Sequence, residues 1–170
     1  MNVTEAIRAR RSIRKYKTAE IPQEDIDKIL EAAMMCPSAR NMRPYAFLVV
    51  KSEQKRRKIA EICPNFRMVS AASAAIIVCG RLDIAAGLGH DFWQQDCSAA
   101  TENILLQALE LGYGTCWCGT YPVKERVEGV KKALGINNDD ILPFSVIALG
   151  VADENPPAKG FYDKTRVMYF

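Results

Sequence analysis

Four short apolar runs, none longer than eight residues, constrain the fold of this chain more than any other feature. They are Tyr45–Val50, Ala74–Cys79, Thr115–Cys118 and Phe144–Val151. Runs of this length that are rich in β-branched and aromatic residues predict buried strands. Longer stretches with helical periodicity lie between them. The residues therefore predict a layered domain of the α+β or α/β class, in which helices cover a sheet.

Capping and punctuation residues mark the ends of the helices. Asn2-Val3-Thr4-Glu5 is a capping box that begins a helix ending near Arg10. Ile21-Pro22 begins the next helix, which Pro37 stops. Three further helices are expected: a basic one capped by Ser52 and reaching about Ile62, the longest at Asp91–Leu111, and one at Val123–Leu134 closed by Gly135.

Length and composition limit the classes of protein that this chain can belong to. With 170 residues, 49% of them hydrophobic, residues 1–170 are expected to form a single domain with a real core. The formal net charge of +3 is too small to argue for a nucleic acid partner. We expect no membrane span, because no run of eighteen apolar residues occurs. The N-terminus reaches Arg8 without an apolar segment, so we expect no secretory signal and a cytoplasmic protein.

The six cysteines are expected to be free thiols in a reducing compartment. Most of them sit in apolar or helical stretches, where cysteine behaves as a small buried hydrophobe. Cys116-Trp117-Cys118 has C-x-C spacing rather than the C-x-x-C of redox and zinc sites. His90 is the only histidine, and we expect it to lie in an exposed loop with no catalytic role. The sequence therefore predicts no metal site.

The densest basic cluster begins with Arg10-Arg11-Ser12-Ile13-Arg14. Guanidinium groups and a hydroxyl suit a phosphate dianion, because arginine donates hydrogen bonds in a rigid bidentate geometry. A solvated basic edge and a contact with nucleic acid are the alternatives. Ser12 and Ile13 interrupt the charges, which favours a defined anion site over either alternative.

A second polar segment, Pro37 to Pro44, connects a helix to a strand. Both prolines are ordinary punctuation, but Ser38, Asn41 and Arg43 place three hydrogen-bonding side chains in one loop, as in a polar pocket. Gly112-Tyr113-Gly114 follows a helix and enters a strand, the reverse of the dinucleotide-binding order. We interpret its glycines as a helix C-cap and a close backbone approach.

These segments, in this order, resemble the nitroreductase family across nearly the whole chain. The resemblance rests on Arg10 to Arg14, on Pro37-Ser38-Ala39 with Asn41 and Pro44, on Asp96-Cys97 leading into Glu102-Asn103-Ile104-Leu105-Leu106, and on Leu111 to Trp117. It implies an α+β, three-layer fold with a central, mostly antiparallel sheet. It also implies an intertwined homodimer with two FMN sites at the interface and exchanged C-terminal tails.

The resemblance also implies roles for individual residues in holding FMN. Arg10, Arg11 and Ser12 would hold the phosphate and ribityl chain, while Arg14 and Asn65 would face the pyrimidine edge. Pro37, Ser38, Ala39 and Asn41 would reach the same flavin from the partner subunit. The backbone at Cys118 and Gly119 would approach the flavin N5 atom. Lys164 and Arg166 in the tail would contact the phosphate, with Lys159 as the alternative residue for this role.

Two departures from the family pattern affect this expectation. Met68 stands where well-known members have a lysine, which should lower the flavin potential unless Arg14 or Arg67 substitutes. Only Arg81 to His90 remains where larger members carry a helical insertion, so the site should be more open. Residues 155–170 form a tail whose aromatic residues are too apolar to leave in water, and we expect it to pack on the partner subunit.

The resemblance implies an FMN-dependent oxidoreductase acting by a ping-pong mechanism, with NADH or NADPH as reductant. A small electron-poor molecule, such as a nitroaromatic or a quinone, would be the acceptor, and no side chain would act as acid or base. The alternatives are another flavin reaction on the same fold, such as dehalogenation or dehydrogenation, and a non-catalytic flavin-binding or nucleotide-binding regulator.

Overall fold

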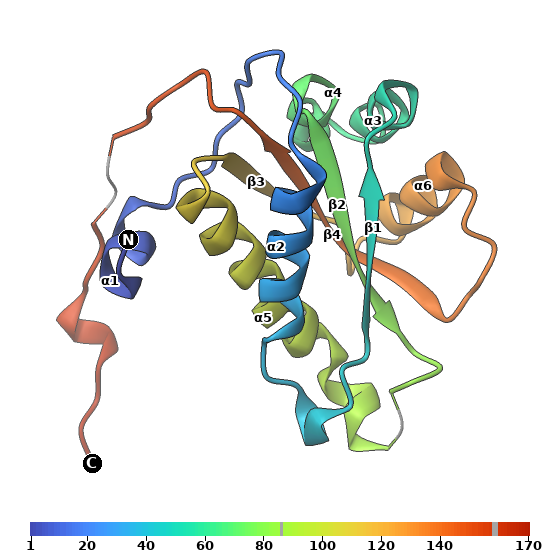
Figure 1. The fold of residues 1–170 in the computed structure, drawn as a ribbon. Helices are drawn as coiled ribbons and strands as arrows, with labels where there is room; N and C mark the ends of the chain where they lie inside the picture. Colours follow the sequence, from blue (N-terminus) through green and yellow to red (C-terminus); the bar gives the residue numbers. More distant parts are fainter. Residues whose placement is uncertain (86, 158–159) are drawn as a thin grey trace.

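A four-stranded antiparallel sheet forms the centre of the computed structural model, which describes residues 1–85, 87–157 and 160–170 (Figure 1). The strand order is β1-β2-β4-β3, so β1 and β3 are the two edges. The strands are β1 (Tyr45–Val50), β2 (Ala74–Arg81), β3 (Gly114–Gly119) and β4 (Ile141–Gly150). All three pairings are antiparallel, which confirms the predicted α+β class.

Helices cover both faces of this sheet and make the fold three layers thick (Figure 1). The helices α2 (Gln23–Met34) and α5 (Leu88–Glu110) pack on one face, around Ile147 and Leu149. The opposite face carries α3 (Glu53–Ala60), α4 (Met68–Ala71) and α6 (Lys124–Leu134), around Val146 and Ala148. Successive residues of β4 thus point into different cores, as the period of two in a strand requires.

Short 3₁₀ turns and one separate helix complete the fold. The turns are η1 (Ala39–Asn41), η2 (Pro64–Phe66) and η3 (Lys164–Arg166). The helix α1 (Val3–Ala9) begins with the predicted capping box, in which Asn2 and Glu5 exchange hydrogen bonds of 2.9 Å. Among the described residues, none of the helices has the length and apolarity needed to cross a membrane.

Two local predictions were wrong. The strand Tyr45–Val50 has the predicted bounds, but only Val50 is buried, because β1 is an edge strand and α2 and α3 cover it only in part. His90 is exposed as expected, but it lies in the first turn of α5 rather than in a loop, because that helix begins at Leu88. The short Arg81–His90 segment therefore includes the start of α5, with residue 86 outside the described residues.

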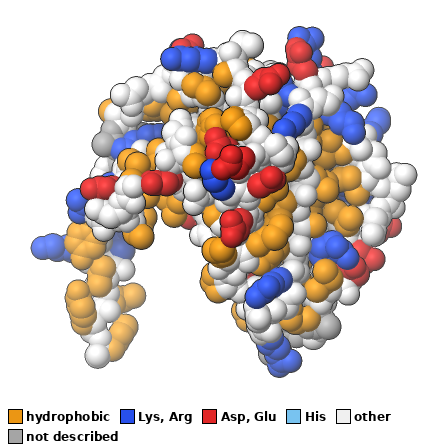
Figure 2. All heavy atoms as spheres, viewed as in Figure 1, with side chains coloured by type: hydrophobic (Ala, Val, Ile, Leu, Met, Phe, Trp, Pro, Cys, Tyr) orange, Lys and Arg blue, Asp and Glu red, His pale blue; other side chains and the backbone are white. Residues whose placement is uncertain are grey.

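The C-terminal arm, residues 160–170, extends away from the sheet on the same side as α1 (Figure 1). Figure 2 shows an open hollow between this arm and the rest of the molecule. The large apolar side chains of the arm are exposed, from Val167 at 40% to Phe170 at 113%. The arm is thus placed to pack on another molecule, and the predicted exchange between subunits stays a prediction.

An ion pair next to β4 provides a test of the fold in solution. The ammonium of buried Lys131 lies 2.8 Å from Asp139 Oδ1, and its hydrogen bond and charge lower the pKa of Asp139 below the usual 3.8. A lowered folded-state pKa stabilises the protein above the unfolded value and stops doing so as the pH falls through the folded value. Asp139→Asn should therefore destabilise the protein at neutral pH, and the difference from wild type should shrink as the pH falls below 3.8.

Urea unfolding of both proteins over this pH range measures the effect. Asp140→Asn is the matched control, since the Asp140 side chain has no bond to Lys131 among the described contacts. A difference between wild type and Asp139→Asn that does not change with pH would contradict the assignment.

Candidate functional site

The basic segment Arg10–Arg14 is fixed along the free edge of β3. Ile13 N–H donates to Thr115 O at 2.8 Å, and Ser12 forms a parallel bridge with Thr115. The Ile13 side chain is buried against Gly114, where a Cβ atom would come within 2.9 Å of it. Gly114 thus allows the close backbone approach that its position predicted, although the group that approaches is Ile13. This packing holds the backbone of the basic segment beside the strand.

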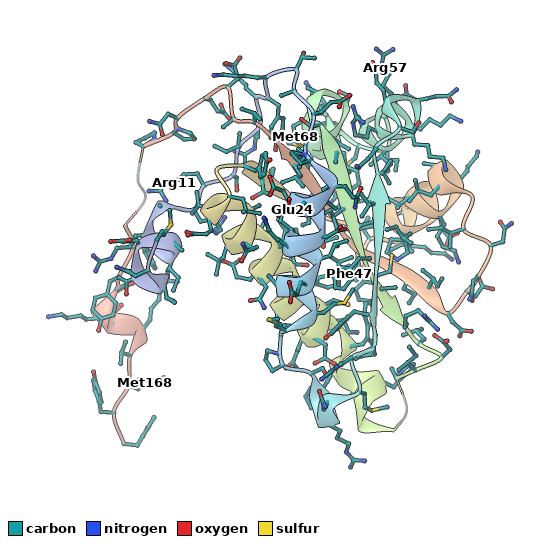
Figure 3. The ribbon with its side chains drawn as sticks, in the orientation of Figure 1. Arg11, Glu24, Phe47, Arg57, Met68 and Met168 are labelled. Atoms are coloured by element: carbon teal, nitrogen blue, oxygen red, sulfur yellow. The ribbon has the colours of Figure 1, made fainter. Side chains whose placement is uncertain are left out.

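The three arginines of this segment are not equally available to a ligand. Arg11 Nη1 donates to Arg8 O and Arg10 O at 2.6 Å, and its Nε donates to Pro157 O at 3.0 Å. Figure 3 shows Arg11 between α1 and the chain that leads to the C-terminal arm. Most of the N–H donors of Arg11 are therefore bonded to backbone carbonyls, whereas Arg10 and Arg14 have more N–H donors available to a ligand.

Arg10 and Arg14 differ in how they are restrained. Arg10 Nε lies 3.3 Å from Glu102 Oε1 of α5, in a pair that is partly exposed to solvent. Arg14 is exposed, and its only described side-chain hydrogen bond is a long one of 3.4 Å to Ser12 O. Both guanidinium groups can thus turn toward an anion at the sheet edge.

The end of β3 leaves open space. A Cβ atom added to Gly119 would meet no heavy atom within 4 Å, and the residue is exposed. Arg126 of α6 donates from Nη1 to Gly119 O at 2.8 Å, and its guanidinium lies 5.7 Å from the centre of the Phe66 ring. A flat group can therefore approach the Gly119 backbone, whose carbonyl is held by Arg126.

The neighbouring helix α4, which follows the turn η2, brings a sulfur atom to the same strand. Asn65 is exposed on η2, and Met68 of α4 lies 3.5 Å from the Cys118 thiol, measured between the sulfur atoms. A hydrogen bond from the Cys118 side chain and the charges of Arg14 and Arg10 lower the pKa of Cys116 to about 7, although burial opposes this. The pKa of Cys118 is raised by the same interaction and by burial.

The loop between α2 and β1 has a strained backbone. Arg40, Asn41 and Arg43 all have φ between 50° and 56°, a left-handed backbone conformation that residues other than glycine rarely adopt. Arg43 holds this shape, because its N–H donates to Ser38 Oγ at 2.9 Å and its Nε donates to Asn41 Oδ1 at 3.0 Å. The Ser38 hydroxyl hydrogen and the Asn41 amide hydrogens stay available to a ligand. Such strain is typical of ligand-binding segments.

A buried carboxylate anchors this loop to α5. Asp96 is 5% exposed, and its Oδ1 accepts from Ala39 N–H at 3.0 Å. Its Oδ2 has no hydrogen-bond partner among the described residues. A cavity of about 470 Å³, lined in part by Pro37, Ser38 and Phe92, lies beside it. An unpaired buried acceptor is costly, so this position favours a ligand or a neighbouring chain that brings a donor.

Within one chain the two polar segments stay apart. The loop is anchored at Asp96 and the basic segment at Glu102, six residues farther along α5 and therefore about 9 Å along the helix axis. No hydrogen bond or ion pair among the described residues joins Pro37–Asn41 to Arg10–Arg14 or to Gly119. This separation fits a site assembled from two chains.

The predicted tail residues lie outside this site. Lys164 and Arg166 are exposed on η3, where Arg166 pairs with Asp163 at 3.2 Å and lies 5.0 Å from the centre of the Phe161 ring. Lys159 falls outside the described residues. Their predicted contact with the phosphate stays a prediction. The sequence indicates no role for Arg126, because nothing near it shows that its helix begins beside Gly119.

Comparison with known proteins agrees with this geometry. The model of the Nitroreductase family matches residues 7–81 and 65–151. A "Putative NADH dehydrogenase/NAD(P)H nitroreductase" of Methanothermobacter thermautotrophicus is 48% identical over 167 residues, which cover 98% of this chain and 86% of that protein.

Solved structures share the whole fold. A protein of the same name from Parabacteroides distasonis is 36% identical, with a TM-score of 0.92 over 98% of this chain and 96% of that one. An FMN-dependent nitroreductase from Clostridium difficile is 28% identical, with a TM-score of 0.89 and 98% of both chains covered.

Proposed function

Because the chain belongs to the nitroreductase family, we propose that it is an NAD(P)H-dependent oxidoreductase that holds FMN beside Arg10–Arg14 and the exposed end of β3 at Gly119. One observation carries the proposal: a basic segment is hydrogen-bonded to β3, whose last residue, Gly119, faces open space. Arginine forks suit a phosphate, and a glycine without a crowding neighbour suits a flat ring.

The residues around this edge of the sheet and in the Pro37–Asn41 loop fit FMN in their hydrogen-bonding chemistry. FMN offers a dianionic phosphate, ribityl hydroxyls that donate, and ring carbonyls that accept. Arg10 and Arg14 supply cationic donors, and the unpaired Oδ2 of Asp96 is an acceptor. Ser38 and Asn41 of a partner subunit would supply further donors, with Pro37 and Ala39 shaping their loop. When bound, FMN supplies hydride acceptance at N5 and electron transfer to a second molecule.

The protein's own groups would position FMN and adjust its reduction potential, and they would not themselves react with the substrates. Arg11 joins α1 to the chain leading to the arm, Ser12 sets the register of the basic segment, and the backbone at Cys118 and Gly119 bounds the open space. Met68 brings no charge to the pyrimidine edge, so we expect a lower flavin potential than a lysine would give there. We further propose that the protein acts as a homodimer, since one chain keeps the loop and the basic segment apart.

NAD(P)H and the acceptor would use the same open face in turn, which is a ping-pong mechanism. An electron-poor acceptor, such as a nitroaromatic or a quinone, fits this scheme because the open space beside Gly119 imposes few contacts on it. Parallel lines in double-reciprocal plots at several acceptor concentrations are the expected result. Intersecting lines would contradict the scheme while leaving the cofactor assignment intact.

An absorption spectrum followed by anaerobic addition of NADH or NADPH tests the proposed function. We expect flavin bands that bleach with the nicotinamide and return when a quinone is added. Bands that persist would favour a different flavin reaction or a binding role. A protein that takes up no FMN on reconstitution would contradict the proposal.

A further inference from the structure

Two sulfur atoms from separate elements lie in contact behind the edge strand, and a third sulfur lies on the same face of β3. Cys118 Sγ lies 3.5 Å from Met68 Sδ of α4. Cys116 is two residues before Cys118, so both side chains leave β3 on the same face, in the core shared with α3, α4 and α6. The two cysteines are only 4% and 3% exposed, and both thiols are free. We propose that Cys116, Cys118 and Met68 form a binding site for one Cu(I) ion per chain.

The spacing suits a bridging ion better than a disulfide. Residues two apart in an extended strand have Cα atoms about 6.7 Å apart and nearly parallel side chains. That distance is at the upper end of what a disulfide spans, and parallel Cβ vectors oppose the bond. An ion with metal–sulfur bonds of about 2.3 Å joins sulfur atoms up to about 4.6 Å apart. The 3.5 Å between Met68 and Cys118 falls within this reach.

The ligand set selects the ion. Thiolate and thioether sulfurs prefer Cu(I), whereas carboxylate and water ligands suit Mg²⁺ and Ca²⁺. Structural zinc sites require four ligands, typically cysteine and histidine. In the part of the chain that the structure describes, no group of three or more His, Cys, Asp or Glu side chains could hold a metal. The third ligand here is a methionine, which favours a soft monovalent ion over Zn²⁺.

Charge and protons balance in this assignment. Both thiols lose their protons and bind one Cu⁺, which leaves a net charge of −1 on the cluster. The ion enters from the side of Met68, which is only half-buried, whereas the cysteines are covered. Once bound, it joins α4 to β3 and should raise the unfolding temperature.

Competition for Cu(I) tests the proposal on the full chain reconstituted with FMN. The protein is titrated anaerobically with Cu(I) in the presence of bicinchoninate, whose coloured complex reports the copper that the protein leaves unbound. We expect one tightly held ion per chain, proton release on binding, and sulfur-only coordination by X-ray absorption. The affinity should fall as the pH is lowered, because protons compete for the thiolates.

Matched variants locate the ion. Cys118→Ser should abolish tight retention, and the volume-conserving Met68→Leu should weaken it at least roughly tenfold, the loss typical of removing even an outer-shell partner. Cys36→Ser is the control, because this buried cysteine contacts Asp96 O at 3.8 Å and lies in the other core. It should bind Cu(I) as wild type does.

Several results would overturn the site. The first two are no retention of Cu(I) by wild type, and equal retention of Cu(I) by Met68→Leu and wild type. The others are nitrogen or oxygen ligands in the X-ray absorption spectrum, and binding of Zn²⁺ as tight as that of Cu(I). Copper uptake is measured apart from flavin absorption and turnover, so a failure of this site is distinguishable from a failure of the proposed flavin chemistry.

Discussion

Deletion of residues 160–170 is expected to give a monomer that no longer retains FMN. The arm has no described hydrogen bond to the rest of its own chain, and its aromatic residues Phe161, Tyr162, Tyr169 and Phe170 are 73–113% exposed. In Figure 3, Met168 lies on the arm, well away from the sheet. Exposed apolar surface of this extent marks an interaction site, and each large side chain buried contributes about 1.5–3 kcal/mol.

Losing several such contacts should weaken the dimer by at least about a thousandfold. Light scattering after size exclusion measures the mass, and absorption measures the retained flavin. Circular dichroism should still report the sheet and its helices, because the arm adds nothing to either core.

Two further variants sharpen the interpretation of this deletion. Replacing Phe161, Tyr169 and Phe170 by serine in the full-length chain should reproduce the monomer, since the apolar surface is then lost without shortening the chain. Glu128→Ala, on the exposed face of α6 across the sheet from the arm, should remain a flavin-loaded dimer (Figure 1). A truncated protein that stays a fully loaded dimer would rule out the predicted exchange of arms.

Arg10→Ala should weaken FMN binding by about 10- to 100-fold while leaving the apoprotein folded. The estimate follows from the roughly 1.5–3 kcal/mol that a hydrogen bond to a charged group contributes. The pair between Arg10 and Glu102 is partly exposed, and such pairs contribute at most about 1 kcal/mol to stability. Titration of the apoprotein with FMN, followed by flavin fluorescence, measures the affinity, and thermal unfolding checks the fold.

Arg8→Ala is the matched control for this substitution, because it removes the same charge from an exposed position in the last turn of α1. We expect a small effect that disappears at high salt, as for a distant, screened charge. If both variants lost the same affinity, the basic segment would act through its net charge, and the specific phosphate contact would be wrong.

Local features of the fold were predictable from the sequence. The capping box at Asn2 and the left-handed glycines Gly112 and Gly135 at helix ends lie where the residues indicated. Each of the four strands lies within three residues of its predicted bounds. These features depend on neighbours within one turn or one strand, so short-range patterns contain the information. The edge position of β1 was not predictable, because it depends on which strand pairs with which.

The candidate site was likewise predictable from the sequence only in part. The residue types in Arg10–Arg14 and Pro37–Asn41 indicated anion and ligand binding from the sequence alone. Their availability did not follow from it, since Arg11 is occupied by the carbonyl of Pro157 and two neighbouring carbonyls. The anchoring of the loop by Asp96 was also missed, because that carboxylate is 57 residues from Ala39.

The sequence by itself determined the elements, the helix caps, the family and the chemical character of the basic segment, because each is encoded in contiguous residues. Only the tertiary structure decided which side chains lie close to one another. Met68 and Cys118 are 50 residues apart, yet their sulfur atoms lie 3.5 Å from each other. That contact depends on the order of the strands and on the position of α4 over β3, both set by packing over the whole core. No local pattern shows it, because the C-x-C spacing gives no information about a methionine 50 residues away.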